Sequence, residues 1–195
     1  MFYTSLQTIH IHLNKGYRMK YGTILSLSVV ICTITISLAE LPLGTAPAEI
    51  TLNGKCGGRL DKQPWSSNEL KGKVFTLYYV DPDESDVNND YYEALKKEDF
   101  PVEKTQSYAI INMKATWLPK SVVSAALKRK QKRYTKTIYV QDLCKTLVSA
   151  WNLKDDSSDN LVFDKDGNVI FSKDGKMTEE DIRKVIELIK TRIGD

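Results

Sequence analysis

Two nearly continuous runs of apolar and aromatic residues constrain the fold of this chain most. They are KVFTLYYV, from Lys73 to Val80, and SYAIINM, from Ser107 to Met113. Runs without strict alternation are typical of central strands that are covered on both faces of a sheet. A helix predicted at about Tyr91 to Glu98 separates the two runs, which favours parallel pairing through a right-handed crossover.

The order of strand and helix continues further along the chain. TIYV, from Thr137 to Val140, is a third strand candidate. A second helix is predicted from Pro119, because proline is favoured at the first helical position. The apolar stripe of this helix consists of Val122, Val123, Ala126 and Leu127.

The carboxyl-terminal part of the chain predicts a hairpin followed by a helix. Asp166-Gly167 separates two β-prone runs, Leu161 to Phe163 and Val169 to Phe171, and Asp-Gly in this setting is a strong hairpin signal. Thr178 and Asp181 resemble a capping box at the start of a final amphipathic helix. The predicted fold class is α/β and thioredoxin-like: a central mixed sheet with βαβαβ, then a β-hairpin and a C-terminal helix.

Two smaller features are predicted before the first central strand. Asn53-Gly54 lies between short β-prone runs within residues 49–60, which predicts an N-terminal β-hairpin extension. Ser66 to Glu69 is expected to open a brief helical turn that ends at Gly72.

The front of the chain has the features of a secretory signal. Met19-Lys20 precedes Thr23 to Ala39, a stretch without charge that ends in small residues. We therefore expect residues 1–39 to be a signal peptide, with Met19 as the true start, and residues 40–195 to form one domain. An uncleaved amino-terminal anchor is the alternative. Cys32 lies inside the apolar run, so no lipoprotein site is predicted.

The predicted signal peptide, residues 1–39, also determines the net charge that remains on the rest of the chain. The full chain has 28 basic and 25 acidic residues, and residues 1–39 hold three basic residues and no acid. The remaining chain is formally neutral, which gives no argument for nucleic acid. The basic run Lys128 to Arg133 lies at the end of a predicted helix, where positive charge complements the helix dipole. Anionic lipid or cell-wall phosphate is the alternative partner for this run.

Removal of the leader also removes both histidines, His10 and His12. A chain without histidine cannot perform Ser-His or Cys-His catalysis, and it lacks the commonest transition-metal ligand. Cys56 and Cys144 are then the remaining thiols. They could form one disulfide, remain as two inert half-buried thiols, or include a reactive thiol, and the sequence leaves these alternatives open.

Several local motifs together resemble the YtfJ family of secreted bacterial proteins. They are Trp65, NELKGKV (Asn68 to Val74), SAWNL (Ser149 to Leu153), NLVFDKDGNVIFSKDG (Asn160 to Gly175) and MTEEDI (Met177 to Ile182). The resemblance covers most of the chain from about Leu41. It implies a periplasmic thioredoxin-like domain of undetermined activity. Some members carry a transcriptional-regulator label, which the residues of this chain do not support.

The positions that make thioredoxins reactive have changed in this sequence. The Cys-x-x-Cys position after the first central strand is occupied by the acidic loop Asp81-Pro82-Asp83-Glu84-Ser85-Asp86. The segment before the hairpin, where thioredoxins place a cis-proline, is Asp156 to Asp159. Dithiol exchange is therefore not expected at this edge of the sheet.

The acidic loop and the hairpin turn both contain several oxygen donors of the kind that calcium prefers. Counting from Asp81, the sixth position is Asp86 instead of glycine and the twelfth is Tyr92 instead of glutamate. In Asp164 to Gly167 the glycine comes two positions too early. We predict no metal site in either segment.

The sequence thus predicts a periplasmic, non-catalytic binding or adaptor domain without a cofactor. Its expected partner is an unidentified periplasmic protein or envelope component, with membrane contact only through the signal, and the protein is expected to be a monomer. One alternative is a thiol redox protein that uses Cys56 or Cys144. Another is a DNA-binding regulator, which would bind with a steep salt dependence.

Overall fold

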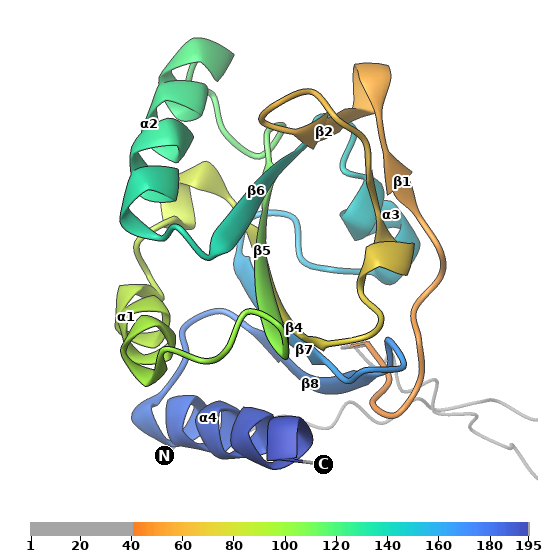
Figure 1. Ribbon diagram of the computed structural model, residues 1–195. Coiled ribbons are helices and arrows are strands. Elements are labelled where there is room, and N and C mark those ends of the chain that lie inside the picture. Colours follow the sequence, from red (N-terminus) through yellow and green to blue (C-terminus); the bar gives the residue numbers. More distant parts are fainter. Residues whose placement is uncertain (1–40, 195) are drawn as a thin grey trace, which may run out of the picture. The chain divides into compact units, whose positions relative to one another are not determined.

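A six-stranded mixed sheet forms the centre of the computed structural model, which describes residues 41–194. The predicted signal segment, residues 1–39, lies outside the described residues. The strand order is β2-β6-β5-β4-β7-β8 (Figure 1). β4, β5 and β6 are parallel, whereas β2, β7 and β8 are antiparallel to their neighbours. The strands are β2 (Gly57–Arg59), β4 (Val74–Val80), β5 (Thr105–Asn112), β6 (Thr137–Asp142), β7 (Ser158–Phe163) and β8 (Val169–Asp174).

Different secondary-structure elements cover the two faces of this sheet. The first face carries three helices, α1 (Asn89–Glu98), α2 (Lys120–Arg133) and α4 (Glu179–Gly194) (Figure 1). The opposite face carries α3 (Thr146–Trp151) and an N-terminal segment with the short pair β1 (Thr51–Leu52) and β3 (Trp65–Ser66). The helices of the described part of the chain are too short or too polar to cross a membrane.

Strand β4 shows why its sequence is apolar without alternation. All seven of its residues are buried. Phe75, Leu77 and Tyr79 belong to the core beneath α3 and the N-terminal segment. Val74 and Val80 belong to the core beneath the three helices. The prediction of a central strand covered on both faces is confirmed.

The predicted hairpin and final helix are also confirmed. β7 and β8 pair on either side of the turn, and the Asp164 Oδ1 accepts the backbone N–H groups of Asp166 at 3.0 Å and Asn168 at 2.9 Å. Thr178 and Asp181 cap α4 reciprocally, with Asp181 N donating to Thr178 Oγ1 at 3.2 Å. Local side chains therefore stabilise both features: Asp164 stabilises the hairpin turn, and the Thr178–Asp181 pair stabilises the start of α4.

The N-terminal extension corrects one prediction. Asn53-Gly54 leads into a 3-10 helix, η1 (Gly54–Cys56), and the segments on its two sides do not pair with each other. β1 pairs with β3, and β2 adds to the edge of the central sheet beside β6. A hairpin at this turn was wrong because β2 finds a longer hydrogen-bonded partner in β6.

The brief helical turn predicted after Trp65 is present. It is the 3-10 helix η2 (Ser67–Glu69), and Ser66 and Glu69 form a complete capping box around it. The turn brings Leu70 into the core beneath the N-terminal segment. Helix α3, in contrast, is absent from the sequence-based prediction.

Candidate functional site

The first candidate site is the edge where the parallel strands end. β4, β5 and β6 terminate at Val80, Asn112 and Asp142, and their register places these ends side by side. Ligands of open α/β sheets bind outside the carboxyl ends of the strands. This edge carries the acidic loop after β4 and the cysteine after β6.

The acidic loop closes the end of β4 with its own hydrogen bonds. The backbone N–H of Asp81 donates to the Ser157 carbonyl at 2.9 Å, which joins the acidic loop to the segment before β7. The Asp81 Oδ1 accepts the Asp83 N–H at 2.8 Å and caps the 3-10 helix η3 (Pro82–Glu84). Burial raises the pKa of Asp81. Helix α1 begins only at Asn89, so a long helix does not start at this position.

The remaining predicted acids of the loop, Asp83, Glu84 and Asp86, are exposed. Asp83 accepts a hydrogen bond from the Thr116 hydroxyl at 3.1 Å. Asp86 pairs with Lys130 at 3.0 Å, and this hydrogen bond lowers the pKa of Asp86. Within residues 41–194 no group of three or more His, Cys, Asp or Glu side chains is placed to hold a metal ion. The loop is a capped, solvated connection.

The two cysteines lie together. Cys56 and Cys144 form a disulfide with their Cα atoms 5.0 Å apart, and it links the end of η1 to the residue two positions after β6. Both cysteines are half-buried. Gly57 permits this approach, since a Cβ there would lie 1.8 Å from the Gln141 carbonyl oxygen. Of the alternatives open from the sequence, the structure contains the bridge.

A buried carboxylate fixes the chain around this disulfide. Asp142 is fully buried and accepts the backbone N–H groups of Cys144 at 3.0 Å and Leu147 at 3.1 Å. The Tyr79 hydroxyl donates to it at 3.3 Å. The Asp142 carboxylate therefore already accepts the N–H of Cys144 itself and one N–H of the first turn of α3, that of Leu147. Neither of these two donors is available to stabilise a thiolate at Cys144.

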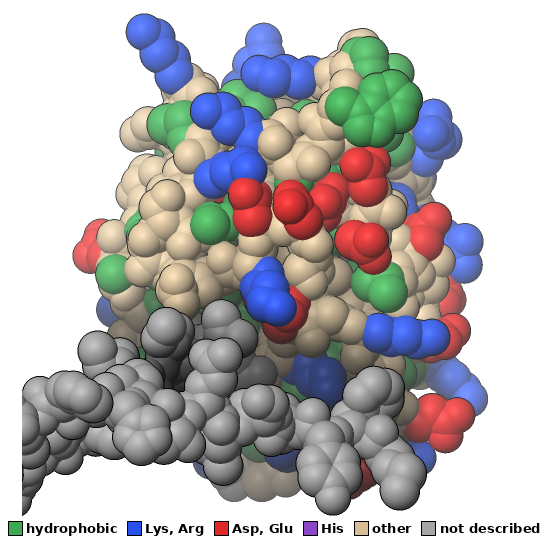
Figure 2. All heavy atoms as spheres, turned by 180° about the vertical axis from the view of Figure 1, so that it is seen from behind, with side chains coloured by type: hydrophobic (Ala, Val, Ile, Leu, Met, Phe, Trp, Pro, Cys, Tyr) green, Lys and Arg blue, Asp and Glu red, His purple; other side chains and the backbone are tan. Residues whose placement is uncertain are grey.

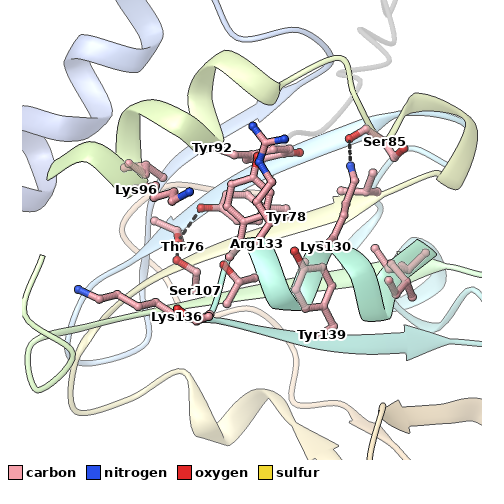
Figure 3. A pocket seen from close by; sticks show the side chains of 18 of the residues that line it. Thr76, Tyr78, Ser85, Tyr92, Lys96, Ser107, Lys130, Arg133, Lys136 and Tyr139 are labelled. Atoms are coloured by element: carbon pink, nitrogen blue, oxygen red, sulfur yellow. Dashed lines mark hydrogen bonds between the residues drawn. The ribbon is translucent and has the colours of Figure 1, made fainter. Parts of the chain in front are cut away.

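The second candidate site is a cavity of about 360 Å³ between α1, α2 and the sheet. Its floor crosses three strands as the row Tyr78, Ala109 and Tyr139. The small side chain of Ala109 between two tyrosines leaves the floor hollow. Thr76 Oγ1 lies 3.1 Å from the Tyr78 hydroxyl and 2.7 Å from Ser107 Oγ, so hydroxyl groups line one part of an otherwise apolar space (Figure 3).

Charged residues surround the mouth of the cavity. Among the described residues, five charged side chains line it: four bases, Lys96, Lys130, Arg133 and Lys136, and one acid, Asp99. Lys130 and Arg133 come from the basic run that the sequence placed at the end of a helix, and the structure confirms that position. The surface seen from behind carries a mixture of bases and acids, with a group of acidic side chains in its upper part (Figure 2).

Sequence reasoning did not identify this cavity. The apolar runs of β4 and β5 predict buried strands, and all residues of TLYYV (Thr76 to Val80) and YAIIN (Tyr108 to Asn112) are indeed buried. The available signal was a small residue, Ala109, in the middle of a strand of large ones. Its meaning depends on which strands become neighbours, which the local sequence does not show.

Together, the sheet order, the three covering helices and the β7-β8 hairpin define a thioredoxin-like protein, and the loop after its strand β4 is acidic and contains no cysteine. The chain belongs to the family described as "Bacterial protein of unknown function (YtfJ_HI0045)", whose model matches residues 46–192. It is 28% identical over 181 residues to the uncharacterized protein YtfJ of Escherichia coli strain K12, covering 88% of this chain and 98% of that protein.

Solved structures agree on the fold. A candidate protein disulfide isomerase from Bacteroides thetaiotaomicron superposes with a TM-score of 0.60 at 12% identity, covering 80% of this chain and 92% of that one. A candidate DsbE thiol:disulfide interchange protein from Chlorobium tepidum gives 0.58 at 12% identity, covering 79% and 99%. Identities this low establish the shared thioredoxin-like fold alone.

Proposed function

We propose that the protein is an exported, periplasmic thioredoxin-like binding domain that does not catalyse dithiol exchange. The observation that carries this proposal is the closed end of β4. Asp81 is bonded to Ser157 where a reactive dithiol would face a proline, and this position holds no sulfur. Export is supported by the uncharged segment Thr23 to Ala39 behind a basic start. The partner on this proposal is a protein or another component of the bacterial envelope.

The disulfide fits the same proposal as a structural crosslink. It fastens the N-terminal segment, which covers one face of the sheet, to the end of an internal strand. A domain in an oxidising compartment gains stability from such a crosslink.

Insulin reduction tests the proposal. With dithiothreitol as the reductant, the purified chain without residues 1–39 is expected to precipitate insulin no faster than dithiothreitol alone. The Cys56→Ser and Cys144→Ser variants are expected to behave identically. Acceleration by the wild-type chain that either substitution abolishes would overturn the proposal.

One observation favours a second function, a thiol redox protein that uses Cys56 and Cys144. The disulfide lies at the carboxyl edge of the sheet, which is the edge where thioredoxin-like enzymes work. Against it, the backbone N–H groups of Cys144 and of Leu147 in α3 are already bonded to Asp142. The insulin assay separates the two functions directly.

A further inference from the structure

The cavity beside β4 has an elongated shape. Val74 and Val80, at opposite ends of the strand, both line it. At about 3.3 Å per residue, its floor is about 20 Å long. Its volume of about 360 Å³ lies in the range of small-molecule sites. An apolar space of this length can hold an extended, flexible chain along the strand.

The walls of the cavity are apolar along most of their length. Val80 and Ile111 from the sheet face Val123 and Leu127 from α2. Within the described residues the Tyr139 hydroxyl has no hydrogen-bond partner, and it points away from β6 into the cavity (Figure 3). Apolar walls with a few polar groups are the usual lining of a small-molecule site.

Three of the four basic lining residues, Lys96, Arg133 and Lys136, lie near one end, whereas Lys130 bonds to the Ser85 carbonyl in the loop after β4. Lys96 Nζ and Arg133 Cζ each lie 5.5 Å from the centroid of the Tyr134 ring. Lys136 pairs with Asp99 at 2.6 Å, and Arg133 pairs with Glu93 at 2.7 Å. These pairs are largely exposed, so they are weak and can exchange with a ligand anion.

The net charge of the residues at the mouth of the cavity is suited to a ligand with a single negative charge. Four bases line the cavity together with Asp99, and two further acids, Asp86 and Glu93, pair with Lys130 and Arg133. The seven residues leave a surplus of one positive charge. A carboxylate carries one negative charge, whereas a phosphate monoester carries about 1.5 to 2 at neutral pH.

We propose that this cavity binds a fatty acid, with its acyl chain along β4 and its carboxylate among Lys96, Arg133 and Lys136. The inference rests on the proposed function as a binding domain and names the class of its ligand. Arg133 suits the carboxylate because a guanidinium donates two parallel hydrogen bonds to it. No covalent step is involved.

Isothermal titration of the chain without residues 1–39, below the micelle concentration of the ligand, tests this assignment. Dodecanoate is expected to bind with a stoichiometry of one. Octanoate is expected to bind at least tenfold more weakly, because it buries fewer methylene groups. Dodecyltrimethylammonium has the same chain with a cationic head and is expected to bind at least fivefold more weakly.

Matched variants locate the site. Ala126 on α2 lines the cavity, whereas its neighbour Ala125 is exposed. Ala126→Phe is expected to weaken dodecanoate binding at least tenfold, and Ala125→Phe to leave it unchanged. Ala109→Leu fills the floor from the opposite side and serves as the second blocking variant. Circular dichroism establishes that each variant is folded.

The head-group contacts are tested separately. Lys136→Gln is expected to weaken dodecanoate binding roughly two- to fivefold, the usual effect of an exposed charge. Arg129→Gln is the control, since Arg129 is exposed on α2 and does not line the cavity.

Three results would overturn the assignment. They are absence of dodecanoate binding, equal affinity for the cationic chain, and unchanged affinity in both folded blocking variants. Binding to phosphatidylglycerol vesicles without binding to dodecanoate would likewise contradict it, because the basic mouth would then recognise a membrane surface. None of these results changes the insulin assay, so failure of this inference is distinguishable from failure of the proposed function.

Discussion

The Asp142 carboxylate accepts the backbone N–H of Cys144 at 3.0 Å, so the residue that ends β6 also fixes the loop that carries the disulfide. The same side chain binds Leu147 N in α3 and the Tyr79 hydroxyl in β4. One buried group thus connects the sheet, the disulfide loop and α3. This arrangement indicates a structural role for the surroundings of Cys144.

The first prediction concerns this carboxylate. Asp142→Ala is expected to lower the free energy of unfolding by roughly 2–4 kcal/mol, because buried N–H donors lose their acceptor. Tyr79→Phe removes one donor only and is expected to cost about 1 kcal/mol. Urea denaturation of both variants measures the difference. A loss below about 1 kcal/mol for Asp142→Ala would show that water replaces the carboxylate.

The disulfide provides the second prediction. It spans a sequence separation of 88 residues, so its loss frees a long loop in the unfolded chain. The double variant Cys56→Ser, Cys144→Ser is expected to lose about 2–5 kcal/mol of stability and to keep its fold, because neither cysteine belongs to the two core clusters. Thermal unfolding and far-ultraviolet circular dichroism give both quantities. An unchanged melting temperature would argue against a stabilising crosslink.

The third prediction is a pH dependence at the carboxyl edge of the sheet. A hydrogen bond from Lys145 lowers the pKa of Asp155 below its usual value of 3.8, and Asn112 donates to Asp155 as well. The stability that the Asp155 charge contributes is therefore complete above about pH 4 and is lost as the pH falls through the folded-state pKa.

Asp155→Asn removes this titration. The variant is expected to be less stable than the wild type at pH 7, and the difference in melting temperature is expected to shrink as the pH is lowered below 4. Melting curves between pH 2.5 and 7 test the sign. A constant difference across this range would show that the Lys145–Asp155 pair contributes no pH-dependent stability.

The hairpin turn gives the fourth prediction. Gly167 has φ +85°, and a Cβ there would lie 3.1 Å from the Leu70 carbonyl oxygen. Gly167→Ala is expected to cost about 1–2 kcal/mol, through backbone strain and this close contact. Gly194→Ala is the control, because Gly194 has open space around it and no positive φ. Equal stability of the two variants would contradict the strain argument.

The elements that were predicted from the sequence are those with strong local signals. β4 follows from a continuous apolar run, and the β7-β8 hairpin follows from Asp166-Gly167. The cap of α4 follows from Thr178 and Asp181. Local chemistry was sufficient in these cases because neighbouring residues make the decisive contacts.

The elements that were missed depend on distant contacts. Asn53-Gly54 has hairpin chemistry, but β2 pairs with β6, a strand far away in the sequence, and β1 pairs with β3. The Leu147 amide in the first turn of α3 is capped by Asp142, a side chain from the preceding strand, and not by a residue at the usual N-cap position.

The candidate sites show the same difference between features with local signals and features that depend on distant contacts. The acidic loop was predicted because the order of elements places it after β4. The pairing of Cys56 with Cys144 stayed open because sequence spacing does not report the distance between two loops. The cavity was invisible because its floor joins Tyr78, Ala109 and Tyr139 from three strands.

The reduction potential of the Cys56–Cys144 disulfide tests the central claim of a structural crosslink most directly. It is measured by equilibrating the chain without residues 1–39 in dithiothreitol redox buffers, followed by alkylation and intact-mass analysis. A structural disulfide is expected to have a potential below about −300 mV. A potential between about −120 and −270 mV, the range of thioredoxin-like redox proteins, would contradict this account.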